Sequence, residues 1–338
     1  MALQADAIAD LIAVTQRDLG KMKWTEIATD LQDYVALPNI LRKNKVGFQS
    51  GYGLQWQVMV KHSGAAKMTG LYAVDDVNVA DVMVNATLNW RHATTNYAIE
   101  RREIAMNRNP ARIVELVKIR RADAMISLAV TMEENFWTLP TVDSAEAHGV
   151  PYWVVTNASE GFNGGHPTGY SDVAGISRTT YPRWKNYTAN YTNVSKTDIV
   201  RKWRKAATKT KFMSPTPIPT YNTGDRYGFY TNYDVIGALE EVLEGQNDNL
   251  GNDIASKDGR LQFRGTKVTW VPYLDDDSTD PVFGINWGVF RPVFLQGEYL
   301  NESRPSKASN QHTVLQSHVD LTFNYECRDC RKLFVLYK

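Results

Sequence analysis

The longest regular hydrophobic pattern in the sequence lies between Asn109 and Trp137, and it predicts a single helix over residues 110–137. Asn109 can accept hydrogen bonds from the free amides of the first turn, and Pro110 suits the first helical position because its missing N–H is not needed there. No glycine or proline follows until Pro140, where the pattern ends. A helix of about 40 Å with one apolar face can support a sheet along its length, although the pattern alone also fits the core helix of an enzyme. The apolar face carries Ile113, Val117, Ala124, Leu128 and Met132, and the opposite face carries Glu115, Lys118, Arg121 and Asp123.

Before this helix the apolar pattern changes to a period of two, which is typical of strands. Apolar residues alternate with polar or long flexible ones over residues 54–60 and again over about 82–90, with a glycine-containing turn or tip between them. This predicts a long antiparallel hairpin, which is only marginally stable by itself in water. Its apolar face therefore needs cover, either from a neighbouring molecule if the hairpin projects or from a sheet of the same chain. The residues expected on that face include Trp56, Val58 and Trp90.

The first 48 residues predict short elements with little core of their own. Residues 3–19 and 25–37 have helical spacing, and the extended segment that follows contains the basic residues Arg42, Lys43 and Lys45. A segment of this kind gains order by lying on another surface, or it forms a small helical cap on its own subunit. The sequence leaves both interpretations open.

The region after the long helix mixes helices and strands, which gives an α+β chain. Residues 196–212 predict a basic helix that includes Arg201 and Arg204, and residues 232–243 predict an acidic helix that includes Glu240 and Glu241. Faces of one charge sign are usually solvated, but in identical subunits packed side by side the two helices could meet and fix the orientation of the contact. Strands are expected at 261–274, 281–297, 318–325 and 332–337, with an acidic turn at 275–280.

Composition limits the function classes. The 338 residues contain 38 Lys and Arg against 37 Asp and Glu, a net charge of +1, and this balance argues against a dedicated nucleic-acid binder. No run of about 18 apolar residues predicts a membrane span, and the N-terminus lacks the pattern of a signal peptide. We therefore expect a soluble protein that is made in the cytoplasm.

No pattern of catalytic or metal-ligating residues rises above background, so we expect neither an enzyme nor a cofactor or metal site. Cys327 and Cys330 have the spacing of half a zinc ribbon, but a structural zinc needs four ligands and no second cysteine pair exists. Two reduced, partly buried thiols are the favoured interpretation. Glu133 and Glu134, near the end of the long helix, are expected on a solvated face.

One passage late in the chain carries a resemblance. Residues 263–275, FRGTKVTWVPYLD, and residues 281–287, PVFGINW, form a strand, an acidic turn and a second strand, and residues 321–336 close the chain with further strands. With the preceding arm, hairpin and long helix, this order resembles the major capsid proteins of tailed bacteriophages, whose fold is shared with encapsulins. The resemblance implies an N-terminal arm over 1–48, an extended loop over 49–95, a peripheral domain over 96–144 and 316–338 that contains the helix 110–137, and a mixed α/β axial domain over 145–315.

The resemblance implies a structural protein that assembles into pentamers and hexamers of an icosahedral virion capsid around double-stranded DNA. The implied partners are identical subunits, a portal, optionally a decoration protein, packaged DNA through nonspecific contacts, and a separate scaffolding protein, since Met1 stands directly before the arm. We expect hairpin contacts between subunits at Trp56, Val58 and Trp90, arm contacts at Arg42, Lys43 and Lys45, and capsomer charge contacts at Arg201, Arg204, Glu240 and Glu241.

Three other hypotheses remain open. An encapsulin-like compartment that holds protein cargo would share nearly every feature, and nucleic-acid content would separate it from a phage head. An α/β enzyme would need a perturbed carboxylate or histidine cluster in a deep pocket. A binding module for nucleic acid or carbohydrate would use exposed rings such as Trp184, Tyr187 and Tyr191.

Overall fold

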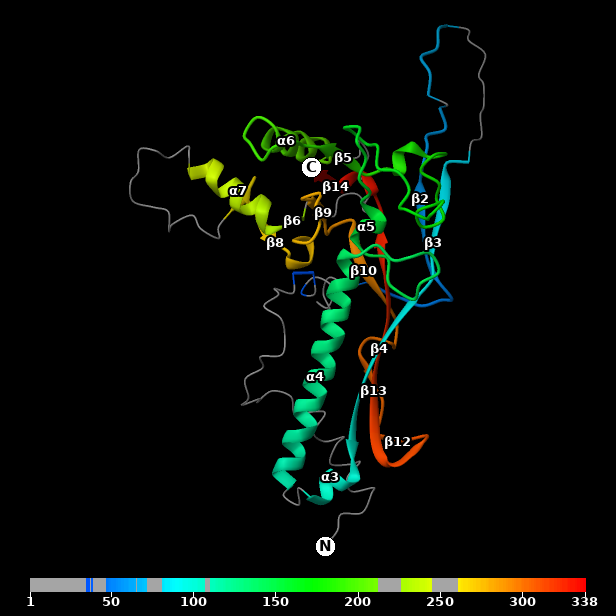
Figure 1. Ribbon diagram of the computed structural model, residues 1–338. Helices are drawn as coiled ribbons and strands as arrows, with labels where there is room; N and C mark the ends of the chain where they lie inside the picture. Colours follow the sequence, from blue (N-terminus) through cyan, green and yellow to red (C-terminus); the bar gives the residue numbers. More distant parts are fainter. Residues whose placement is uncertain are drawn as a thin grey trace.

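The structure of the chain is a computed structural model that describes residues 35, 36, 38, 47–64, 66–71, 81–106, 110–211, 226–244 and 261–338. Its longest helix, α4 (Pro110–Trp137), has the predicted bounds and follows the long axis of the molecule (Figure 1). The helix is continuous because no glycine or proline interrupts it after its first residue. Four residues of the predicted apolar face, Val117, Ala124, Leu128 and Met132, are buried, and the buried Phe136 continues their helical spacing.

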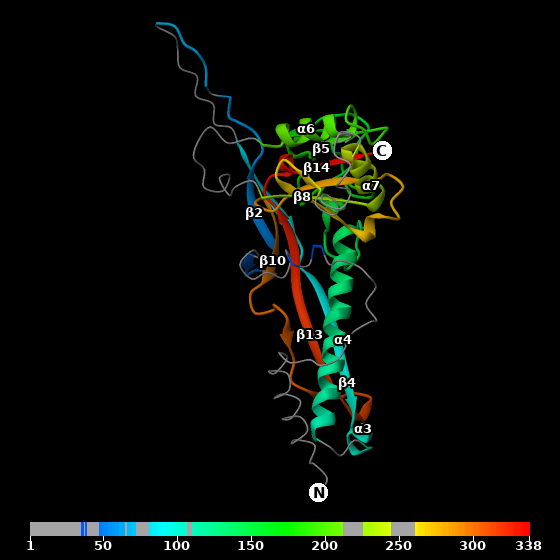
Figure 2. The same cartoon turned by 90° about the vertical axis from the view of Figure 1, so that its left-hand side faces the viewer.

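A first sheet lies along one side of α4. Its central strand, β13 (Gln311–Cys327), pairs antiparallel with β4 (Arg91–Glu100) over the whole length of β4. Figure 2 shows both strands beside the helix. Tyr97 and Val319 from these strands pack with Val117 of α4 in one core cluster. The other strands of the sheet are β1 (Gly47–Gln49), β10 (Phe290–Leu295), β11 (Asn301–Glu302) and β12 (Ser306–Ala308).

A second sheet and the two charged helices form the upper part of the molecule in Figure 1. α6 (Ile199–Lys209) and α7 (Tyr233–Glu244) lie within the ranges predicted for the basic and acidic helices, apart from one residue at the end of α7. Trp203 of α6 packs against Phe229 and Phe263 of the sheet, with ring centroids 5.2 and 4.5 Å away. The sheet has the order β5 (Tyr187–Asn190), β14 (Phe334–Tyr337), β9 (Val282–Asn286), β6 (Tyr227–Thr231), β8 (Thr266–Trp270) and β7 (Gln262–Phe263).

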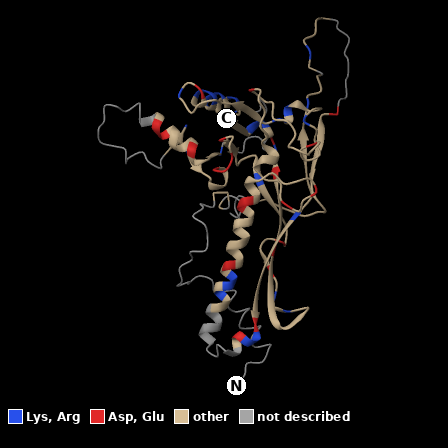
Figure 3. Ribbon diagram, viewed as in Figure 1, with Lys and Arg blue, Asp and Glu red and all other residues tan. Residues whose placement is uncertain are grey.

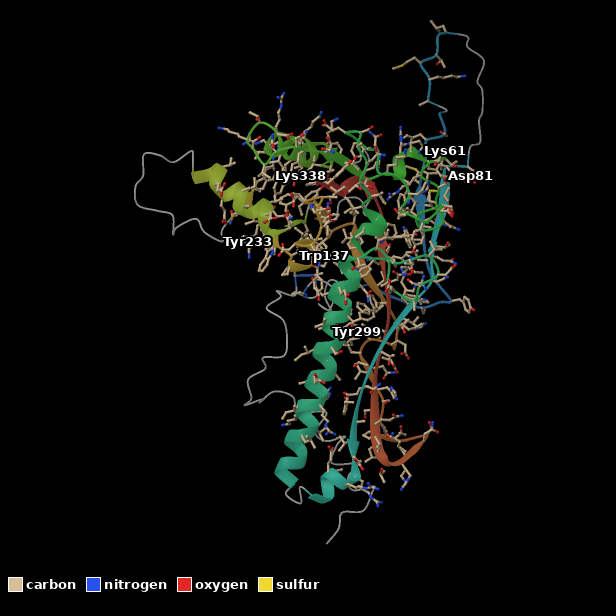
Figure 4. All side chains as sticks on the ribbon, viewed as in Figure 1. Lys61, Asp81, Trp137, Tyr233, Tyr299 and Lys338 are labelled. Carbon is tan, nitrogen blue, oxygen red and sulfur yellow. The ribbon has the colours of Figure 1, made fainter. Side chains whose placement is uncertain are left out.

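The C-terminal end of α4 enters the junction between the two sheets. Phe136 contacts Phe290 and Tyr325 of the first sheet, with ring centroids 6.0 and 5.3 Å apart. The next residue, Trp137, is labelled in Figure 4, and its ring centroid lies 5.4 Å from that of Tyr230 in the second sheet. Two consecutive aromatic residues therefore join the helix to both sheets. The short elements between the strands are α3 (Arg101–Met106), α5 (Val150–Trp153), η1 (Pro182–Trp184), η2 (Pro272–Leu274) and η3 (Cys330–Lys332).

The strands are distributed between the sheets differently from the expected division of the chain. β14, expected beside the long helix, pairs with β5 and β9 in the second sheet, whereas β10, β11 and β12, expected in the axial domain, belong to the first. The turn at η3 causes the first difference, because it redirects the chain between β13 and β14. A strand pattern gives the buried face of a strand but not its partner, and the assignment of these regions to peripheral and axial positions stays a prediction.

Candidate assembly surfaces

The predicted hairpin is present, but its base is covered by the same chain. β2 (Leu54–Met59) and β3 (Met83–Leu88) pair antiparallel, with Leu54 opposite Leu88. Leu54, Val58, Ala86 and Leu88 are all buried within the main core cluster. The hypothesis that this face needs a neighbouring molecule is therefore wrong for the base of the hairpin.

The cover comes from a segment about a hundred residues later in the chain. The ring of Trp56 lies 6.2 Å from that of Trp153, and the Thr87 N–H donates a 3.0 Å hydrogen bond to the Ala174 carbonyl. The alternating pattern predicts that one face is buried but does not say by which molecule. Contact of Trp56 and Trp90 with a neighbouring subunit stays a prediction, since both are only partly buried, whereas Val58 has little surface left for such a contact.

Beyond its base the hairpin extends away from both sheets (Figures 1 and 2). Lys61, after β2, and Asp81, before β3, mark where the two sides of the hairpin leave its base (Figure 4). We call residues 59–64, 66–71 and 81–83 the distal hairpin. Four of its large apolar side chains are exposed. Met59 and Met83 lie on the exposed face of β2 and β3, whereas Met68 and Leu71 were missed by the pattern analysis because they lie beyond the regular alternation. Clustered exposed apolar side chains mark contact surfaces in soluble proteins.

The basic arm residues Arg42, Lys43 and Lys45 lie outside the described residues, but a neighbouring part of the arm is described. The Ala36 N–H donates to both carboxylate oxygens of Glu133, at 2.9 and 3.1 Å.

The same carboxylate of α4 accepts a 2.8 Å hydrogen bond from the Trp137 indole N–H. Glu133 is 1% exposed, so its expected placement on a solvated face is wrong, whereas Glu134 is exposed as expected. A buried carboxylate is retained here because two N–H donors compensate for its lost hydration.

The two charged helices present opposite charges at separate places on the surface (Figure 3). Arg201 and Arg204 of α6 are exposed, and so is Glu241 of α7, while Glu240 is partly exposed. Among the residues that the structure describes, no ion pair joins the two helices.

Other cations of α6 pair locally instead. Lys202 contacts Asp198 and Lys205 contacts Glu160, each with a 2.6 Å nitrogen–oxygen distance. Arg201 and Arg204 therefore remain available for a carboxylate outside this set of pairs.

A cavity of about 320 Å³ beside the hairpin base is lined by His148, the histidine whose pKa is shifted most. Burial, followed by the nearby positive charge of Arg91, lowers the pKa of His148 to about 4, and its Nδ1 lies 3.1 Å from the Asn324 amide nitrogen. The imidazole also packs against the ring of Tyr152, whose pKa burial raises to about 12. A single neutral histidine that binds an amide and an aromatic ring accounts for packing and does not make the cluster that an enzyme site would need.

The rings proposed for a carbohydrate or nucleic-acid module are not exposed. Trp184, Tyr187 and Tyr191 are all buried, and each polar atom has an internal acceptor. The hypothesis of a binding module that uses these rings is therefore wrong, because it requires them to be exposed. In the described part of the chain, no group of three or more His, Cys, Asp and Glu side chains is placed to hold a metal ion. Nor is any described helix both long and apolar enough to cross a bilayer.

No family model and no curated protein matches the sequence. Solved structures do match. The Cyanophage A-1(L) capsid asymmetric unit aligns with a TM-score of 0.64 at 15% identity, over 96% of this chain and 98% of that chain. The capsid of a native GTA particle aligns with a TM-score of 0.57 at 11% identity, over 100% of this chain and 98% of that chain. The chain has the fold of phage capsid proteins.

A third match extends the comparison to another phage type. The capsid of Myoviridae phage XM1 aligns with a TM-score of 0.51 at 9% identity, over 95% of this chain and 97% of that chain. The capsid fold therefore spans nearly the whole chain, which confirms the predicted α+β fold class. At sequence identities this low, the structural matches support a shared backbone fold and assign no role to an individual side chain.

Proposed function

We propose that this chain is the major capsid protein of a tailed bacteriophage, whose identical copies form the pentamers and hexamers of an icosahedral head around double-stranded DNA. The observation that carries the proposal is the exposed apolar surface of the distal hairpin, on a chain with the capsid fold that otherwise covers its own core. A monomer would leave Met68 and Leu71 in water, whereas a neighbouring subunit could cover both.

The size of the contact supports an assembly role. Burying one Met or Leu side chain stabilises by about 1.5–3 kcal/mol. The four exposed apolar side chains of the distal hairpin would therefore contribute several kcal/mol in each contact before the cost of association. Since a closed shell repeats the contact at every subunit, even a modest contribution is multiplied over the particle.

The test uses the double variant Met68→Ser/Leu71→Ser of the full chain. We expect fewer closed particles in electron micrographs and a higher concentration threshold for assembly in sedimentation velocity, with unchanged circular dichroism. The matched control is Val142→Ser, which removes an exposed apolar side chain outside the distal hairpin. Equal assembly of the double variant and the wild type would contradict the proposed role of this surface.

A second contact is proposed between the basic and acidic helices of adjacent subunits. Arg201 and Arg204 of one copy would face Glu240 and Glu241 of the next, in a head-to-tail arrangement that closes into a ring. Exposed charges that face one another across an interface affect the orientation and rate of association more than its affinity. We expect Arg201→Glu/Arg204→Glu to reduce assembly and its salt dependence, and the added exchange Glu240→Arg/Glu241→Arg to restore both. Failure of the exchange to restore assembly would refute this pairing.

The remaining partners follow from the proposed function. Arg42, Lys43 and Lys45 would contact packaged DNA nonspecifically through phosphates, and a separate scaffolding protein, a portal and optionally a decoration protein would complete a virion assembled in the host cytoplasm. The related alternative is an encapsulin-like compartment. Particles purified from producing cells would contain DNA in the first case and protein cargo in the second, so their nucleic-acid content distinguishes the two.

A further inference from the structure

The two cysteines of the chain lie together at the connection between the sheets. Cys327 is the last residue of β13 and Cys330 is the first of η3, from which the chain enters β14 of the second sheet. Both thiols are free and fully buried, and their Sγ atoms are 3.9 Å apart. The pair therefore lies within a short sulfur displacement of a disulfide.

A fully buried arginine, Arg178, lies beside this pair. Its guanidinium donates to the Trp153 carbonyl at 2.7 Å and to the Gly165 carbonyl at 2.6 Å, with a longer contact of 3.4 Å to the Asn186 side-chain oxygen. All these acceptors are neutral, and Nε has no hydrogen-bond partner among the described residues. Since a guanidinium keeps its charge in a protein, the buried group requires a nearby negative charge.

Asp329, a carboxylate whose charge acts on both thiols, is already compensated. Asp329 binds Arg331 through two side-chain contacts, at 3.0 and 2.9 Å. Arg178 acts on Cys330 through its charge and a side-chain hydrogen bond, so Cys330 is an ionisable partner of this buried cation. Burial raises the pKa of Cys330, but the hydrogen-bond contact with Cys327 and the charge of Arg178 outweigh it, so its pKa lies below the ordinary value. Burial and the neighbouring Cys330 hold the pKa of Cys327 well above its ordinary value.

We propose that Cys327 and Cys330 form a redox-active dithiol in which Cys330 is the thiolate nucleophile, Arg178 is its buried counter-charge, and a small hydroperoxide is the oxidant. The Cys330 thiolate attacks one oxygen of hydrogen peroxide, the O–O bond breaks, and hydroxide leaves, which gives a sulfenic acid. The Cys327 sulfur then attacks the Cys330 sulfur, the S–O bond breaks, and the Cys327 proton leaves with the oxygen as water. The two sulfurs lose two electrons and the peroxide gains two. Hydrogen peroxide is small and uncharged, which the full burial of both thiols demands of the reagent.

The disulfide would join the end of β13 to the start of η3 and so restrain the turn that connects the two sheets. This consequence rests on the proposed function: a capsid protein is made in a reducing cytoplasm and meets oxidants after release from the cell. The bond would then form after assembly, in the finished particle. The chemistry itself does not depend on assembly and can be measured on the isolated chain.

The experiment treats the folded full chain with hydrogen peroxide, then denatures it in an alkylating reagent and measures its intact mass. Because the sequence contains only 2 cysteines, the readout is unambiguous. We expect the loss of two hydrogen atoms, no alkylation, and recovery of two alkylated thiols after reduction. Two alkylatable thiols after treatment, or disulfide-linked dimers, would overturn the proposal.

The single variants Cys327→Ser and Cys330→Ser assign the nucleophile with little change in side-chain size. A dione reagent should trap sulfenic acid in Cys327→Ser, whereas Cys330→Ser should react severalfold more slowly, because burial raises the pKa of the remaining Cys327 thiol and leaves less thiolate. Equal rates in the folded variants would overturn the assignment, and the denatured variants, where both thiols should react alike, are the control. Particle formation measured on the same samples separates the two proposals, because a disulfide without particles would contradict the capsid function alone.

Discussion

The buried carboxylate of Glu133 offers the sharpest test of how the arm is attached to the long helix. Glu133→Gln leaves a single acceptor oxygen. At the Oε1 position this oxygen still accepts from both Ala36 and Trp137, but the negative charge is lost, and the second contact of the Ala36 N–H, 3.1 Å from Oε2, would face an NH₂ group. A hydrogen bond to a charged group contributes about 1.5–3 kcal/mol, against about 0.5–1.5 kcal/mol for a hydrogen bond to a neutral group. We expect the variant to weaken the attachment of Ala36 by about 1–2 kcal/mol.

Hydrogen exchange measures this attachment locally. The Ala36 amide is buried and bonded, so it exchanges through opening of the contact, and a loss of about 1–2 kcal/mol should accelerate exchange roughly 5- to 30-fold. The matched control is Glu134→Gln, the same chemical change at the adjacent exposed position. For this variant we expect the free energy of opening at Ala36 to change by less than about 0.5 kcal/mol. Exchange of the Ala36 amide that stayed within twofold of wild type in Glu133→Gln, or accelerated equally in both variants, would refute the reasoning.

Three further predictions concern stability. Arg121→Met should destabilise the chain by about 3 kcal/mol in urea unfolding, because it removes the two-point ion pair with the mostly buried Glu302 carboxylate, at 2.7 and 2.8 Å; a loss below about 0.5 kcal/mol would contradict this. Gly284→Ala should lower the free energy of unfolding by about 1–3 kcal/mol in thermal unfolding, since its methyl group would overlap the buried ring of Phe334. An unchanged melting temperature would count against the pairing of Gly284 with Phe334 between β9 and β14. His148 has a folded pKa of about 4, below its ordinary value of 6.5, so the unfolded chain binds the proton first and stability should fall by up to about 3 kcal/mol as the pH drops from 6.5 to 4. His148→Gln should remove this part of the pH dependence, and an identical slope in the variant would show that other groups cause it.

The sequence predicts the local elements well because their signals are local. Pro110 and the apolar spacing up to Trp137 define α4 at both ends, since a helix is determined by residues three and four apart. Glu133 and Glu134 illustrate what such signals lack: the two residues are chemically identical neighbours, and only the approach of Ala36, about a hundred residues earlier, makes one of them a buried acceptor. The cover of Leu54 by residues far along the chain is equally non-local.

Folding and assembly are separable in this chain, because different surfaces serve them. The base of the hairpin and the end of α4 bury their apolar side chains within one subunit, so the fold does not require a neighbour to cover its core. The exposed side chains that remain, Met68 and Leu71 among them, lie on the distal hairpin and contribute nothing to that core. Subunit concentration should then control the population of particles and not the folding of each subunit, in contrast to obligate oligomers that have no stable folded monomer. This separation is what allows a serine variant at Met68 and Leu71 to report on assembly alone.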